Sequence, residues 1–274
     1  MGTRERQRLG AQLHRLREAA AVTLAEAAFE LSWPPERILR LEAGLATIRR
    51  ADFKELLSFY SADVDASLRL LEGTSGWWTQ YSDELDTDGE TLLILEDGAN
   101  LVQSHHPGLI PGLLQTRAYT AALVGTRADQ PWGRLERLVE LRQERGRVLR
   151  NGSLKLVAVI DEAALRRPVG GPTVMREQYQ HLISAITGLG VTIRIRPLVA
   201  EPFREVCCTF HIFKLSESTR LGHTVVQLEL LDREHFEWDA KRIVRYQDAF
   251  ARAQRGALDA DASVEFLAEL AEAC

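Results

Sequence analysis

The sequence predicts a mainly α N-terminal domain followed by a larger α/β (α+β) domain with a small mixed sheet. Three observations predict this fold class. Apolar residues recur at helical spacing through residues 4–72 with only short breaks. The composition changes at Trp77, where acidic and apolar segments begin. Beyond residue 150 the patterns run strand, helix, strand, strand, strand, helix. A chain of 274 residues accommodates two domains, which we expect at residues 1–73 and 77–274.

The composition is that of a globular protein with a real core, because 45% of the residues are apolar and 27% are charged. No stretch approaches the roughly 18 apolar residues of a membrane span, and no apolar signal core follows the Arg-rich start. The three cysteines form an odd set without metal-ligand spacing, namely Cys207, Cys208 and Cys274. We therefore expect a cytoplasmic protein without membrane, metal or cofactor.

The net charge of −5 and the pI of 5.9 argue against a surface wholly dedicated to nucleic acid. Residues 1–60 nevertheless hold ten Lys/Arg against eight Asp/Glu, a local charge of +2. This asymmetry is compatible with DNA as a partner and does not establish it.

In the N-terminal domain, the first helix is indicated by leucines at i, i+4 and i+7. Thr23 and Glu26 form a capping box for a helix over residues 24–31. After a turn at Ser32-Trp33, Pro34 and Pro35 start the next helix, since prolines fit only the first turn. Gly44 closes that helix in a left-handed conformation. Two further helices are expected at about 51–61 and 64–71.

In the C-terminal domain, helices and strands follow from changes of apolar period. Uncharged β-branched residues in "LKLVAVID" indicate a buried strand, and alternation in "VTIRIRPL" indicates a half-buried one. The expected strands cover residues 154–161, 191–198, 207–215 and 224–232. The expected helices cover residues 117–125, 132–149, 174–190 and 239–256.

The segment "TLAEAAFELSWPPERILRLEAG" resembles the helix-turn-helix of the phage-repressor-like XRE family. The resemblance rests on the capped second helix, the small residues Ala27 and Ala28, the turn, and Arg40-x-Glu42 before Gly44. It implies that the third helix is a DNA-recognition helix. It also implies that Arg40 and Glu42 tie this helix to its neighbours.

The recognition surface departs from the family pattern, which places short polar side chains at its start. Here these positions hold Pro34, Glu36 and Leu39, of which Glu36 can accept from cytosine and Leu39 can contact thymine methyl or a protein. Arg37 suits a guanine or a phosphate. The expected DNA-binding residues are Arg37, Glu36, Arg40, Arg49 and Arg50, the last two as backbone clamps. The alternative is a packing module with solvent-exposed arginines.

The remainder of the chain resembles the C-terminal domain of unknown function (DUF5753-like) that accompanies this helix-turn-helix in many actinobacterial regulators. Its motifs occur in the family's order: "LEDGANLVQSHHPGLIPGLLQTRAYTAAL", "LRQERGRVL", "VIDEAALRRPVGGPTVMREQYQHL" and "VTIRIRPL". The resemblance implies a transcriptional regulator that binds a small-molecule effector or a partner protein through this domain.

Candidate ligand-binding residues come from three places in this remainder. Glu162, Arg166 and Arg167 follow a strand end, where ligands collect in α/β sheets. Alternatively, the arginines pair with Asp161 or Glu162 and fix the loop. His105 and His106 depart from the family pattern, and in extended chain one of them faces a pocket. Trp77 and Trp78 fill an interdomain joint or line an apolar pocket.

Three functions remain open at this level. The first is a DNA-binding regulator, for which a homodimer is a reasonable form. The second is a natural-product tailoring or cyclising enzyme that kept the regulator architecture, with catalytic residues unknown. The third is a protein-interaction module that uses Leu39 of the third helix.

Overall fold

The chain divides into two compact units in the computed structural model. The first comprises residues 1–98 with 217–223, and the second comprises residues 99–216 with 224–274. The structure describes residues 2–126, 131–202, 207–219, 222–230 and 233–274. Residues 77–98, which we assigned to the C-terminal domain from the sequence, belong to the first unit. Among the described residues, no helix is long and apolar enough to cross a membrane.

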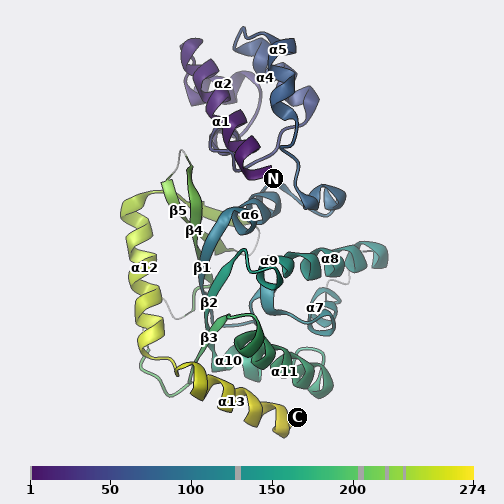
Figure 1. The fold of residues 1–274 in the computed structure, drawn as a ribbon, viewed down its shortest axis with the longest axis vertical. Helices are drawn as coiled ribbons and strands as arrows, with labels where there is room; N and C mark the ends of the chain where they lie inside the picture. Colours follow the sequence, from purple (N-terminus) through teal and green to yellow (C-terminus); the bar gives the residue numbers. More distant parts are fainter. Residues whose placement is uncertain (1, 127–130, 203–206, 220–221, 231–232) are drawn as a thin grey trace. The chain divides into compact units, whose positions relative to one another are not determined.

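Residues 2–98 of the first unit form helices joined by short connections (Figure 1). Its core lies between the first four helices, where residues such as Leu13, Ile38 and Phe53 are almost fully buried. The expected boundaries hold to within a few residues. The elements are α1 (Gly2–Ala19), α2 (Leu24–Glu30), α3 (Pro35–Glu42), α4 (Arg50–Phe59), α5 (Val64–Leu68), η1 (Arg69–Leu71), η2 (Trp77–Tyr81) and α6 (Thr87–Gly98).

The second unit is built on a six-stranded mixed sheet of order β3-β2-β1-β4-β5-β6. Strands β1, β2 and β3 are parallel to one another, β4 is antiparallel to β1, and β6 is antiparallel to β5. The strands are β1 (Ala99–His106), β2 (Lys155–Asp161), β3 (Thr192–Arg196), β4 (Phe210–Thr219), β5 (Gly222–Glu229) and β6 (Glu234–Glu237).

Helices cover both faces of this sheet (Figure 1). Ile243 and Phe250 of α12 pack against Val159, Phe210 and Val226 on one face. The opposite face receives α10 and α11. The helices of this unit are η3 (Gly112–Leu114), α7 (Arg117–Val124), α8 (Trp132–Arg145), α9 (Arg147–Arg150), α10 (Glu162–Arg166), α11 (Pro172–Gly188), α12 (Ala240–Arg255) and α13 (Ala260–Ala273).

The expected fold class is confirmed. The elements that we did not predict from the sequence include β1, β6, α6, α10 and α13. The strand expected at 207–215 begins only at Phe210, so Cys207 and Cys208 precede β4 and are exposed.

Candidate nucleic-acid interface

Helix α3 is positioned by a tight turn whose residues are set by the sequence. Thr23 caps α2, and its capping box with Glu26 is present as predicted. Ser32 adopts φ of 53°, and the Trp33 N–H donates to the Ala28 carbonyl over 2.9 Å. Pro34 occupies the N-cap of α3, so the chain enters the helix in the extended conformation that proline favours.

A buried ion pair joins α3 to α1. Arg17 donates from Nε and Nη2 to the two carboxylate oxygens of Glu42, over 2.6 and 3.0 Å. This hydrogen bond raises the pKa of Arg17. His14 lies 3.1 Å from the same carboxylate. Because Glu42 is only 2% exposed, this ion pair is shielded from solvent and holds α3 in a fixed orientation against α1.

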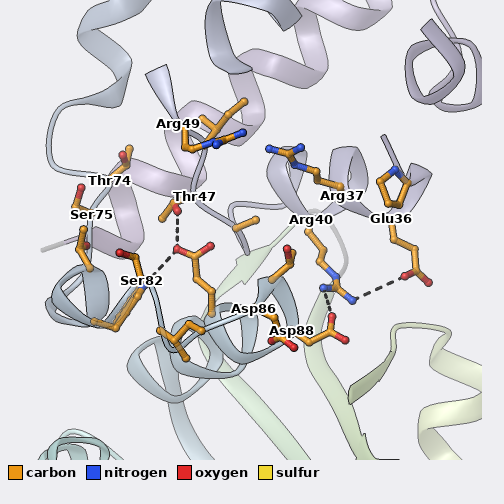
Figure 2. Close-up of a pocket in the computed structure, with 18 residues that line it drawn as sticks. Glu36, Arg37, Arg40, Thr47, Arg49, Thr74, Ser75, Ser82, Asp86 and Asp88 are labelled. Atoms are coloured by element: carbon orange, nitrogen blue, oxygen red, sulfur yellow. Dashed lines mark hydrogen bonds and ion pairs between the residues drawn. The ribbon is translucent and has the colours of Figure 1, made fainter. Parts of the chain in front are cut away.

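Arg40 lies inside the first unit, away from the exposed surface of α3. The residue is 6% exposed, and its Nη1 donates to Asp88 Oδ1 over 2.6 Å, as Figure 2 shows. Glu36 adds a weaker contact at 3.8 Å, and Thr91 of α6 lies 3.4 Å away. Arg40, one of the expected DNA contacts, is thus buried where α3 meets α6.

Arg37 and Arg49 share one carboxylate at the junction between α3 and α4. Arg37 donates to Asp52 Oδ2, and its guanidinium stacks 3.9 Å from the Trp33 ring centroid. Arg49 reaches Asp52 Oδ1 over 2.9 Å. Burial raises the pKa of Asp52, but the hydrogen bonds from Arg37 and Arg49 outweigh it and lower the pKa overall. Two positive charges on one negative charge leave this junction net positive.

The exposed surface beside this junction is suited to a polyanion. The Arg49 side chain is 82% exposed, Arg50 is exposed, and 27% of the Arg37 side chain is accessible. Glu36 is also exposed, whereas Leu39 is half-buried. An arginine held by stacking and an ion pair is preorganised for a bidentate contact to guanine or phosphate. We did not predict the role of Asp52 or the stacking of Arg37 on Trp33. The i, i+3 spacing of Arg49 and Asp52 in the sequence indicates the ion pair between them.

A pocket of about 880 Å³ lies beside α3 within the first unit (Figure 2). Thr47 donates to Glu90 Oε1 across its wall, and Trp78 Nε1 lies 3.4 Å from the same oxygen. Of the two tryptophans predicted to bind ligand, Trp78 lines this pocket. It is nearly fully buried, with Arg6 over its ring at 5.1 Å. Trp77 packs edge-on against Trp78, 5.8 Å between ring centroids.

The charged residues that follow β2 fix loops in the second unit. Arg166 Nε donates to Glu162 Oε1 over 2.5 Å, and Glu162 Oε2 accepts from the Leu198 N–H over 2.9 Å. Burial alone raises the pKa of Glu162, but these hydrogen bonds lower it. Arg167 donates to the Gly108 carbonyl over 3.0 Å. Arg166 therefore pairs with Glu162, whereas Arg167 contacts the Gly108 carbonyl and neither Asp161 nor Glu162.

His105 and His106 lie on opposite faces at the end of β1. His105 Nδ1 lies 2.8 Å from the Cys208 carbonyl, and Nε2 lies 3.4 Å from Asp161 at the end of β2. His106 packs against His211, 4.9 Å between ring centroids. Burial, with the neighbouring His211, holds the pKa of His106 well below its usual value, so its imidazole is neutral. Within the described ranges, no group of three or more His, Cys, Asp and Glu is arranged to hold a metal ion.

Comparison with protein-family models gives two matches. A helix-turn-helix domain matches residues 8–71, which contain α2, α3 and the Arg37–Asp52–Arg49 junction. A domain of unknown function (DUF5753) matches residues 90–269 and so covers more than half of the chain. Comparisons with curated proteins and with solved structures found no match. The chain therefore belongs to the DUF5753 family and carries an N-terminal helix-turn-helix domain.

Proposed function

We propose that this protein is a DNA-binding transcriptional regulator whose C-terminal domain binds a small molecule or a partner protein. The observation that carries the proposal is the exposed cationic junction of Arg37, Arg49 and Arg50 beside the recognition helix. The helix-turn-helix match supports DNA as the partner. The proposal places the protein in the cytoplasm and includes a homodimer as its working form, because helix-turn-helix dimers bind paired half-sites.

In this proposal the arginines have different tasks. Arg37 contacts a base edge from the first turn of α3, and Glu36 borders that contact. Arg49 and Arg50 hold the phosphate backbone. Arg40 acts indirectly, because its ion pair with Asp88 holds α3 in place. Among the described residues, no observation favours the enzyme alternative.

The salt dependence of DNA binding tests the proposal. The purified chain is titrated with a random-sequence 30-bp duplex pool over a series of salt concentrations. Each lost phosphate contact lowers the slope of log K against log[salt] by about 0.9. We expect Arg49→Ala and Arg50→Ala each to lower that slope by about this amount.

Arg69→Ala is the matched control, because Arg69 is exposed and lies in η1, outside α3 and α4. We expect its slope to equal that of the unaltered chain. Absence of duplex binding at low salt, or equal losses in all three variants, would contradict the proposed function.

A further inference from the structure

A row of polar side chains crosses one face of the sheet in the second unit, where apolar packing is the rule. The row begins on β1, continues through β4 and β5, and ends on β6. Its members, which we call the polar row, are Ser104, His106, His211, Gln227, Glu229 and Glu234.

Contacts between neighbouring strands connect the row. Ser104 is the register partner of His211, and the His106 ring packs edge-on against the His211 ring. His211 Nε2 lies 3.7 Å from Glu229 Oε1. Gln227 Nε2 donates to Glu234 Oε2. These side chains therefore lie on one face and form a continuous polar strip.

Three members of the row are buried with unsatisfied polar atoms. Gln227 and Ser104 are 0% exposed and His106 is 4% exposed. Among the described residues, no hydrogen-bond partner faces Gln227 Oε1, Ser104 Oγ or His106 Nε2. A buried polar group without a partner costs free energy, so such groups are rare unless a ligand or water completes them. Three such unsatisfied atoms in one strip indicate a binding site for a polar molecule.

The strip accepts more hydrogen bonds than it donates. Gln227 Oε1 is an acceptor only, and the Glu229 and Glu234 carboxylates are acceptors when ionised. Glu229 and Glu234 are also directly paired across β5 and β6, where like charges repel. Burial raises the pKa of Glu234, and the Glu229 charge adds to that rise. A cation that donates hydrogen bonds would relieve this repulsion and give Gln227 Oε1 a partner.

The location agrees with this chemistry. His106 is the last residue of β1, and ligands of open α/β sheets bind beyond the carboxyl ends of the parallel strands. Arg142 acts electrostatically on Glu229, and Arg145 acts on Glu234, both from α8. These two arginines partly offset the negative charge of Glu229 and Glu234.

We propose that the polar row binds a small primary amine, whose ammonium group donates to Gln227, Glu229 and Glu234. The inference rests on the proposed function, in which the C-terminal domain binds a small molecule, and it names the site and the ligand class. His211 positions Glu229. Ser104 and the neutral His106 form hydrogen bonds with a second polar group of the ligand.

Equilibrium dialysis of the full chain against radiolabelled ethanolamine tests the proposal directly. We expect saturable binding of one molecule per chain. Ethylene glycol offers hydroxyl donors without the charge, and tetramethylammonium chloride offers the charge without donors. At equal concentration and constant ionic strength, neither should displace ethanolamine.

Variants locate the site. Glu234→Gln and Gln227→Leu should each weaken ethanolamine binding by about tenfold or more. Glu265→Gln, an exposed carboxylate on α13, is the matched control and should bind as the unaltered chain does. Circular dichroism verifies that each variant is folded. If a variant does not fold, Ser104→Ala takes its place as a test of the polar row.

Three results would overturn the polar row as an amine site: no saturable binding at millimolar ethanolamine, equal displacement by tetramethylammonium, or unchanged affinity in folded row variants. The dialysis contains no DNA. A negative result therefore removes the amine site alone, whereas failure of duplex binding removes the proposed regulator function.

Discussion

Burial separates the roles of arginines that look alike in the sequence. Arg40 and Arg49 both lie near the recognition helix, but the former is 6% exposed and the latter has a side chain that is 82% exposed. Arg40 is enclosed by α6, which lies far along the chain, and a local pattern cannot reveal that contact. The sequence therefore predicted a charged recognition surface and could not divide its arginines between packing and DNA.

The ion pair between buried Arg40 and half-buried Asp88 leads to a stability prediction. Arg40→Ala removes a hydrogen bond between charged groups and leaves Asp88 without this partner. We expect the free energy of unfolding to fall by about 1.5–3 kcal/mol, measured by urea denaturation. Arg69→Ala, at an exposed site, should change it by no more than about 0.5 kcal/mol. Equal effects would show that Arg40 is not a packing residue.

Asp52 predicts a particular pH dependence. Its pKa is lowered in the folded chain, so its contribution to stability is present above the unfolded pKa of about 3.9. That contribution is lost as the pH falls through the lowered folded pKa. Asp52→Asn should therefore destabilise the chain by about 1–3 kcal/mol at pH 7, and the difference from wild type should shrink below about pH 4.

Urea denaturation at a series of pH values measures this difference. Asp83→Asn, at an exposed position, controls for general effects of a lost carboxylate. A difference between wild type and Asp52→Asn that stays constant into strong acid would contradict the role of the Arg37–Asp52–Arg49 junction.

At the scale of elements, the crossing of α1 and α3 depends on close backbone approach. A Cβ atom at Gly10 would lie 2.6 Å from the carbonyl oxygens of both Leu41 and Glu42. Both contacts are with backbone, so the helices must separate to admit a methyl group. Gly44 adds the left-handed turn, at φ of 72°, that ends α3.

Gly10→Ala should therefore cost about 1–3 kcal/mol of unfolding free energy and weaken DNA binding as α3 moves. Gly133→Ala is the matched control, because a Cβ at Gly133 meets nothing within 4 Å on helix α8. We expect that change to be neutral or to stabilise by about 0.5 kcal/mol. Calorimetry compares the two variants. A neutral Gly10→Ala would contradict the close-packed crossing.

Elements with local signals were predictable, and those without them were not. The cap at Thr23, the proline start of α3 and the apolar run of β2 are all contained in a few residues. Strand β1 was missed because it follows α6 without a break and carries Gln103, Ser104, His105 and His106. A strand in the middle of a sheet is usually apolar. Of these four polar residues, Ser104 and His106 belong to the polar row.

At the scale of the whole molecule, the overall charge of −5 conceals a cationic junction beside α3. The sequence also predicted two domains. It did not indicate that residues 77–98 pack with the first unit, because the composition changes at Trp77 while the packing changes after Gly98. Composition is a local property of the sequence, whereas the boundary of a compact unit depends on contacts between distant segments.

We propose that this chain recognises a DNA sequence through Arg37 and holds it through Arg49 and Arg50. Selection of binding duplexes from a random library at low salt tests that claim most directly. We predict one enriched motif. Arg37→Ala should relax one motif position, at a cost of about 1–3 kcal/mol. Arg49→Ala with Arg50→Ala should weaken all sequences alike. If the wild-type chain enriched no motif beyond that of a variant with Arg37→Ala, Arg49→Ala and Arg50→Ala combined, sequence recognition through Arg37 would be contradicted.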